Sequence, residues 1–359
     1  MTPKSGTLRR ALFLAGLVLV MALAVSYLWP GRSGPAGQTG PVRLDRTITV
    51  APFGDALAPL VFSPDGQTLA ALGFEKAYLY NLTTRRRAGT WTNPDPVHNN
   101  PTDLAFSPHG EELVISNSGE RSGIVWDIAT RTVTSTIPNP PNEFIYNTAL
   151  SPDGKLLAES SDWAGHTYLW DTVTRHYAGV LTDPGFGVDP LAFSPDGSTL
   201  AVGDGAVGDP GRGYGRIALW NIAGRTIRAS YQAPNQGEVQ AVAFSRNGAL
   251  LAASSIDRAY LWDVTTGQQT RTLAGPPGAV IREIVFSPDG RMLAAAVTSN
   301  AACIWNLTTG KIVATMPDTG NSEIASLAYS PDGKTLAVGD YHGHVYLWNV
   351  SKTDPQPKD

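Results

Sequence analysis

The sequence predicts an all-β protein: a seven-bladed β-propeller of four-stranded antiparallel blades, preceded by one N-terminal transmembrane helix. A pattern of 42 to 51 residues recurs seven times between residues 44 and 350, and each copy holds a tight turn followed by a strand that ends in an aromatic residue. One such unit cannot bury both of its faces, so the copies must stack, and seven of them can close into a ring that removes most open sheet edges.

A tight turn marks the start of each copy. In Ser63-Pro64-Asp65-Gly66 the proline presets φ, the aspartate tolerates the next turn position, and the glycine accepts the left-handed backbone that closes a hairpin. The same turn returns in the later copies, and as Ser245-Arg246-Asn247-Gly248 it lacks the proline. Two antiparallel strands are therefore expected around every turn.

The third strand of each copy carries one large aromatic residue at a constant place. Burial of about 200 Å² of indole stabilises the fold by up to about 5 kcal/mol, so we interpret these residues as packing residues. They are Tyr80, Trp126, Trp170, Trp220, Trp262, Trp305 and Trp348, so six of the nine tryptophans share one position of the repeat.

The last copy ends at Val350 with its third strand, and the polar tail 351–359 is too short to add a fourth. The segment Arg46 to Pro52 has the form of a fourth strand but precedes the first copy, where it has no hairpin partner. We therefore expect it to complete the last blade and to join the two ends of the propeller, residues 44–350, into one circle.

The N-terminal region predicts a membrane anchor. Residues 11–29 contain no charge and at about 1.5 Å per residue can span a hydrocarbon core of about 30 Å. Lys4, Arg9 and Arg10 precede this segment, so residues 1–10 are expected in the cytoplasm and the propeller on the extracytoplasmic side. Residues 30–43 are rich in Pro, Gly and Ser and predict a flexible linker. The alternative is a cleaved signal peptide and a secreted protein, because Ala22-Leu23-Ala24 resembles a cleavage site.

Charge and cysteine content exclude several classes of function. Residues 1–43 hold five basic and no acidic residues, so the remainder of the chain carries a net charge of −9 and lacks the basic surface that nucleic-acid binding requires. The single cysteine, Cys303, cannot form an internal disulfide or a cysteine-rich metal site. We expect no cofactor, no nucleic-acid partner and no enzymatic activity, since no catalytic motif is present.

The turns and the endings Leu169-Trp170-Asp171 and Leu261-Trp262-Asp263 resemble the WD-repeat β-propeller family over about residues 44–350. The N-terminal segment makes the chain similar to bacterial membrane-anchored WD-repeat proteins. The resemblance implies a disc that binds other proteins and rarely catalyses. Two family features are missing: the Gly-His pair before the first strand, and the aspartate before the third strand, where Ile256 and His342 stand at the expected spacing.

Only one group of side chains suggests a metal site. His342 and His344 alternate on an extended segment next to Asp340, so both imidazoles point the same way, but no second cluster completes a ligand set. A plain surface loop is the competing interpretation.

The expected partner-binding face consists of the loops between blades. Aromatic side chains on a rigid ring suit an interface, although each of them can instead pack inward against a blade. The candidates are Phe53, Trp91, His98, Phe144, Tyr146 and Phe186.

Two functions compete. The first is a membrane-tethered scaffold or sensor module that binds other proteins or envelope components. The second is a propeller enzyme, or a small-ligand or metal binder, that uses the mouth of the channel. A purely structural role in an envelope complex differs from the first only by its partner.

Overall fold

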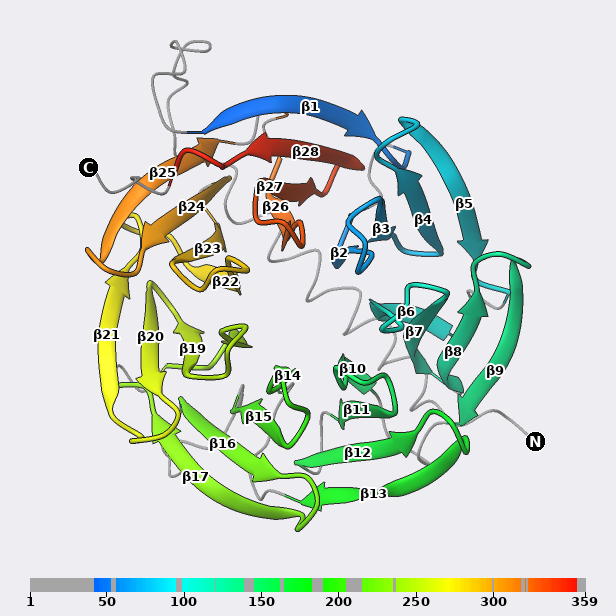
Figure 1. The fold of residues 1–359 in the computed structure, drawn as a ribbon, viewed down its shortest axis with the longest axis horizontal. Helices are drawn as coiled ribbons and strands as arrows, with labels where there is room; N and C mark the ends of the chain where they lie inside the picture. The colour runs from blue at the N-terminus through cyan, green and yellow to red at the C-terminus, as the bar shows by residue number, and fades with distance from the viewer. Residues whose placement is uncertain are drawn as a thin grey trace, which may run out of the picture. The chain divides into compact units, whose positions relative to one another are not determined.

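The structure, a computed structural model, describes residues 42–353 except 53–55, 95–98, 120, 139–144, 162–164, 183–189, 205–214, 235–236, 299, 318–319 and 321. The described residues lie in one compact unit, Gly40–Asp359. They form seven four-stranded antiparallel sheets, which confirms the predicted fold class for this part of the chain (Figure 1). The described residues include no helix that is long and apolar enough to cross a membrane, and the proposed membrane segment 11–29 lies outside them.

Each blade runs from an innermost first strand to an outermost fourth strand. Blade 1 contains β2 (Leu60–Phe62), β3 (Thr68–Leu72), β4 (Lys76–Asn81) and β5 (Arg86–Thr92). Blade 2 contains β6 (Asn99–Phe106), β7 (Glu112–Gly119), β8 (Arg121–Asp127) and β9 (Thr132–Pro138). Blade 3 contains β10 (Ile145–Leu150), β11 (Leu156–Ser161), β12 (His166–Asp171) and β13 (His176–Thr182). Blade 4 contains β14 (Leu191–Phe193), β15 (Thr199–Gly203), β16 (Arg216–Asn221) and β17 (Thr226–Gln232).

The remaining blades repeat this order. Blade 5 contains β18 (Ala241–Phe244), β19 (Leu250–Ser255), β20 (Arg258–Asp263) and β21 (Gln269–Ala274). Blade 6 contains β22 (Ile281–Phe286), β23 (Met292–Val297), β24 (Ala301–Asn306) and β25 (Lys311–Pro317). Blade 7 contains β26 (Ile324–Tyr329), β27 (Thr335–Asp340) and β28 (His344–Asn349), with β1 (Arg43–Thr49) as its outer strand. The innermost strands contact one another in sequence, and β26 contacts β2, so the ring is closed.

The closure of the ring by both ends of the chain is confirmed, with a shift of the predicted boundaries. Strand β1 pairs antiparallel with β28, from Arg43 opposite Asn349 to Thr49 opposite His344. The predicted strand, Arg46 to Pro52, was therefore placed three residues too late at both ends. Leu44 packs against the core between blades 6 and 7, whereas the chain after Thr49 turns away and donates the backbone N–H of Val50 to the carbonyl of Gly343 at 2.9 Å.

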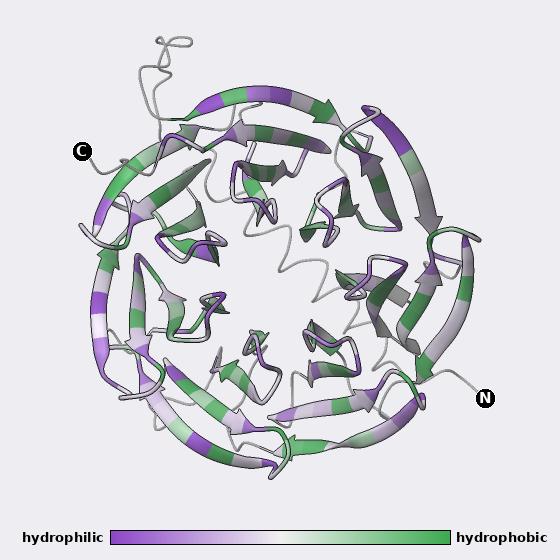
Figure 2. Ribbon diagram, viewed as in Figure 1, coloured by the Kyte–Doolittle hydropathy of each residue, from purple (hydrophilic) through white to green (hydrophobic). Residues whose placement is uncertain are grey.

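The hydrophobic core lies between neighbouring blades. Each described core cluster combines side chains from two adjacent blades. The second strands are buried almost throughout, while outer strands such as β5 alternate between buried and exposed residues, and Figure 2 shows hydrophilic residues along β1 and β5. All six repeat tryptophans are buried, and each packs onto the preceding blade, which confirms their role as packing residues.

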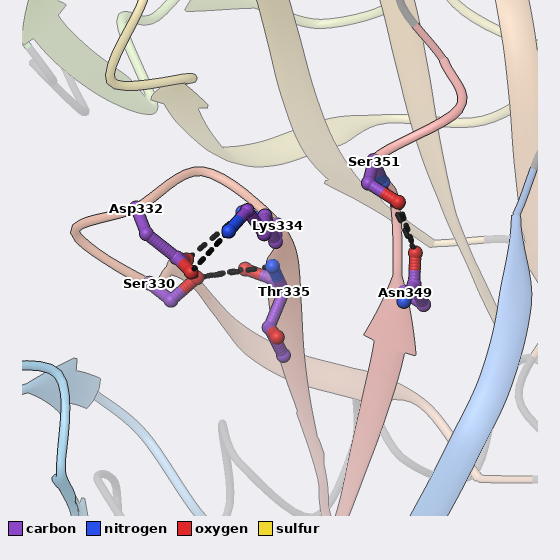
Figure 3. Close-up of polar contacts among 6 residues, drawn as sticks. All are labelled: Ser330, Asp332, Lys334, Thr335, Asn349 and Ser351. Carbon is purple, nitrogen blue, oxygen red and sulfur yellow. Dashed lines mark hydrogen bonds and ion pairs between the residues drawn. The ribbon is translucent and has the colours of Figure 1, made fainter.

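The tight turn between the first and second strands is held by its own side chains. In blade 7 the Ser330 hydroxyl donates to Asp332 at 2.7 Å and accepts the Thr335 N–H at 3.0 Å, and the Lys334 N–H donates to Asp332 at 3.0 Å (Figure 3). These bonds satisfy backbone N–H groups of the turn without a contribution from a neighbouring blade.

These turns also contact one another around the ring. The proline of each Ser-Pro turn lies beside the turn glycine of the next blade; a Cβ built on Gly66 would lie 3.3 Å from Pro331, which links blade 7 to blade 1. The exception is the boundary between blades 5 and 6. There Arg246 replaces the proline, and a Cβ on Gly290 would have no other atom within 4 Å.

Candidate functional site

The direction of the strands divides the ring into two ends. Because consecutive strands are antiparallel, the links between second and third strands lie at the same end as the links between blades. We call this the loop end. The Ser-Pro turns and the turns between third and fourth strands lie at the opposite end, which we call the turn end.

The loop end carries three exposed large hydrophobic side chains on links between second and third strands. They are Phe74 in blade 1, Ile256 in blade 5 and Tyr341 in blade 7, and their exposed fractions are 59%, 48% and 41%. Val173 is exposed at the turn end, and the other exposed large hydrophobic residues among those described lie on outer strands. The described part of the loop end therefore offers apolar contact area at separate points of a rigid ring.

The predicted partner-binding residues differ in their position and in whether the structure describes them. Trp91 lies on β5, not on a loop; its side chain is 3% exposed and packs between blades 1 and 2, as the inward-packing alternative requires. Tyr146 lies on β10, but its side chain is outside the described part of the structure. Phe53, His98, Phe144 and Phe186 also lie outside the described residues, so their proposed role stays a prediction.

Asp340 organises the link between β27 and β28. Its carboxylate is fully buried: Oδ1 accepts the backbone N–H groups of His342 at 2.9 Å and His344 at 2.8 Å, and Oδ2 accepts the Tyr346 hydroxyl at 3.0 Å. The Nδ1 atom of His344 also lies 3.1 Å from Oδ2. Asp340 therefore shapes a tight loop, two residues before the position at which the family aspartate was expected.

The metal hypothesis receives no support from this geometry. Within the described ranges, no three His, Cys, Asp or Glu side chains lie close enough to hold a metal ion, and Asp340, His342 and His344 are no exception. The oxygen atoms of Asp340 already accept the hydrogen bonds of its own loop. The arrangement fits the competing interpretation, a structured surface loop.

Two carboxylates on innermost strands reach across blade boundaries. Glu283 on β22 accepts the backbone N–H of Leu327 at 2.9 Å and the Ser326 hydroxyl at 3.3 Å, which ties blade 6 to blade 7. Asp103 on β6 accepts the Thr148 hydroxyl at 2.8 Å, which ties blade 2 to blade 3.

Both carboxyl groups are harder to ionise than usual. Desolvation raises the pKa of Glu283 to about 8, and the charge of Asp103 adds to this rise. Desolvation also raises the pKa of Asp103 to about 6, although its hydrogen bonds oppose the change. Near neutral pH, Glu283 is therefore mainly protonated and Asp103 is mainly ionised.

Glu159 is the most unusual buried group among the described residues. It occupies a position of the second strand at which the other six blades have Ala, Ile or Val, and its side chain is fully buried. Neither carboxylate oxygen has a hydrogen-bond partner. Burial raises its pKa to about 8; the indole N–H of Trp170 favours the ionised form, but it does not reach hydrogen-bond geometry.

A pocket of about 320 Å³ opens where blade 7 meets blade 1. Its charged lining residues are Lys76 and Arg87, and neither is a predicted site residue. The sequence signal for this place is the aromatic position of the repeat, since blade 1 alone has tyrosine, Tyr80, where the others have tryptophan.

Comparisons with known proteins agree with this architecture. The family described as "WD domain, G-beta repeat" matches residues 225–263, 267–306 and 310–349. Each match begins before the fourth strand of one blade and ends with the third strand of the next, so the sequence repeat links neighbouring blades. A search of curated proteins finds no significant match.

Many solved structures have a similar fold. One of them is a chain from "Crystal Structure of Mitotic Checkpoint Complex", with a TM-score of 0.74 and 18% identity over 91% of this chain and 98% of that chain. At this identity the likeness shows the fold alone. The described ring defines a seven-bladed β-propeller. The three repeat matches cover the outer strand of blade 4 and blades 5 to 7 apart from β1, so this part of the ring is similar to the WD-repeat family.

Proposed function

We propose that this protein is a membrane-tethered WD-repeat scaffold or sensor module that presents its loop end to a protein partner. The observation that carries the proposal is the closed seven-bladed ring, whose cores between blades hold the loop end rigid while Phe74, Ile256 and Tyr341 stay exposed. Rigid aromatic and aliphatic side chains bury much area at a low cost in conformational entropy.

The membrane tether rests on the sequence of residues 1–43. The uncharged stretch 11–29 follows Lys4, Arg9 and Arg10, and this charge bias favours a cytoplasmic N-terminus and an extracytoplasmic propeller. The linker 30–43 would let the propeller turn relative to the bilayer. The acidic surface makes binding to a basic partner sensitive to salt.

Site-specific photocrosslinking in cells tests the partner-binding face. A photoreactive phenylalanine analogue at Tyr341 probes the loop end, and the same analogue at exposed Lys334 probes the turn end. We expect a discrete protein adduct from position 341 that is absent from position 334 and is lost when the probe at position 341 is combined with a Phe74→Asp, Ile256→Asp double variant. Equal adducts from both positions, or adducts that persist in the double variant, would refute a loop-end interface.

Fractionation and labelling test the tether. The intact chain should remain in the membrane fraction after alkaline extraction, and deletion of residues 11–29 should release it. A Ser33→Cys variant should react with a membrane-impermeant maleimide added to spheroplasts, because the linker is expected outside and Cys303 is fully buried. A mature N-terminus located after Ala24 would instead show that the segment is a cleaved signal peptide.

A further inference from the structure

The pocket at the closure of the ring has walls from two distant parts of the chain. One wall is the segment Thr49 to Pro52, where the chain leaves β1, and the other wall consists of residues on β4 and β5 of blade 1. We call it the closure pocket. Its volume of about 320 Å³ lies within the range of pockets that accept small molecules, at the lower end.

Strand register places the polar side chains of blade 1 on one face. Lys76 lies opposite Thr92, and Tyr78 lies opposite Thr90. Residues directly opposite each other in an antiparallel pair, and residues two apart in a strand, share a face. Tyr78 packs in the same core cluster as Ile48, so this face looks toward blade 7.

Arg87 has a preorganised position at the pocket. Its Nη2 atom donates to the backbone carbonyl of Val50 at 2.7 Å, and its guanidinium carbon lies 5.1 Å from the centroid of the Tyr78 ring. These contacts hold the charge in place and use only part of the five N–H donors of the guanidinium. The remaining donors are available to a ligand.

Lys76 supplies a second positive charge, and no carboxylate among the described residues pairs with it. It is half-buried, and its side chain forms no hydrogen bond or ion pair with the described residues. The pocket lining contains no carboxylate, and the hydroxyl groups of Thr90 and Thr92 donate to no described side chain. In a domain with a net negative charge, two cations and two hydroxyl donors therefore converge on one pocket.

The other blades are built differently at this position. Opposite the repeat tryptophan, their outer strands carry Val133, Tyr177, Ile227, Gln269, Ile312 and, from β1, Leu44. Only blade 1 pairs an arginine, Arg87, with a smaller aromatic residue, Tyr80. Arginine at this position supplies the planar set of N–H donors that suits phosphate and carboxylate groups.

We propose that the closure pocket binds a small organic anion through a phosphate or carboxylate group. Lys76 and the free N–H donors of Arg87 contact the anionic oxygens, and the hydroxyl groups of Thr90 and Thr92 add neutral hydrogen bonds. A ligand there touches both the segment that follows β1 and blade 1, so its binding also strengthens the closure of the ring.

Isothermal titration calorimetry on the full-length chain in mild detergent tests the proposal. The probes are inorganic phosphate, glycerol phosphate and succinate, with glycerol as the uncharged control. We expect at least one anion to bind with unit stoichiometry and glycerol to give no signal. Binding should weaken as the salt concentration rises from about 50 mM to about 500 mM, because salt screens charges at the pocket mouth. The relative affinities of the three anions identify the source of the oxyanion group.

Two variants separate this site from general charge effects. Lys76→Ala should weaken binding about tenfold, which is the loss expected for one charge-assisted contact. Lys311→Ala removes an exposed lysine of the outer strand of blade 6 and should leave the affinity unchanged. The bound anion should also raise the midpoint of thermal unfolding of the parent chain but not that of Lys76→Ala. Absence of binding by all three anions, or equal binding by both variants, would overturn the proposal.

Discussion

The backbone N–H of Leu60 donates a 3.0 Å hydrogen bond to the hydroxyl oxygen of Ser326, which lies 266 residues further along the chain. This bond crosses the boundary between blade 7 and blade 1. The Ser326 hydroxyl in turn donates to Glu283, so three blades are joined by two consecutive bonds at their innermost strands.

The first prediction concerns this connection. Ser326→Ala leaves the buried N–H of Leu60 without its acceptor, and the free energy of unfolding should fall by about 1–3 kcal/mol. Urea unfolding followed by tryptophan fluorescence measures the change. Ser351→Ala is the control, because that exposed serine bonds only within its own turn and its loss should cost less than about 0.5 kcal/mol (Figure 3). Equal effects of the two changes would show that the bond across the boundary adds nothing.

The second prediction concerns pH. Burial raises the pKa of Glu159 to about 8 from 4.5, so the folded state holds a proton that the unfolded state releases. The full stability is therefore present below about pH 4.5 and is lost progressively as the pH rises to about 8, by a few kcal/mol. Glu159→Gln should reduce this loss, as measured by urea unfolding at closely spaced pH values. An unchanged pH profile in the variant would contradict the burial of an unpaired carboxyl group.

The third prediction concerns the boundary between blades 5 and 6, where the turn proline is replaced by Arg246. Arg246→Pro should raise the free energy of unfolding by about 0.5–1 kcal/mol, because the proline restricts the unfolded chain and can pack beside Gly290 as its equivalents do elsewhere. The backbone N–H of Arg246 makes no hydrogen bond in the described structure, so none is lost. The reverse change, Pro195→Ala, should lower stability by a similar amount. A destabilised Arg246→Pro variant would mean that this turn differs from the other six.

The fourth prediction concerns the closing strand. Ile48 is buried beside Val345, so Ile48→Ala should lower the free energy of unfolding by about 2–4 kcal/mol and speed hydrogen exchange of the β28 amides. Thr47 is exposed on the same strand, and Thr47→Ala should change both measurements little. If exchange in β28 stays slow in Ile48→Ala, the closing strand does not protect that edge.

The fifth prediction concerns the only cysteine. Cys303 is fully buried in blade 6, and burial raises the pKa of its thiol to about 12, so almost no thiolate forms near neutral pH. Mass spectrometry should detect no maleimide adduct on the native chain and a single adduct in urea. Rapid labelling without denaturant would contradict this burial.

The ring could be predicted from sequence because its determinants are local and repeated. The turn at Ser330 to Thr335 is held by side chains within six residues, and every repeat tryptophan packs on the preceding blade in the chain. The boundaries of β1 were harder to predict. Its register depends on pairing with β28 at the other end of the chain, so the pattern alone placed it three residues late.

The candidate site was much less predictable. Trp91 looked like a loop aromatic, but the strand continues through it, and alternation along β5 turns its ring into the core. Lys76 and Arg87 lie on separate strands, and their neighbours from Thr49 to Pro52 belong to a segment that is remote until the ring closes. Nothing in their spacing indicates that they share a pocket.

The amino-acid sequence by itself determined the repeated blade, the number of blades and the use of both chain ends to close them, because turn residues and strand periodicity act over a few residues. Tertiary structure alone decided which polar groups meet between blades: Leu60 with Ser326, Asp103 with Thr148, and Arg87 with Val50. These contacts arise only when distant segments pack together, and burial rather than local sequence then determines their charge and their hydrogen bonds.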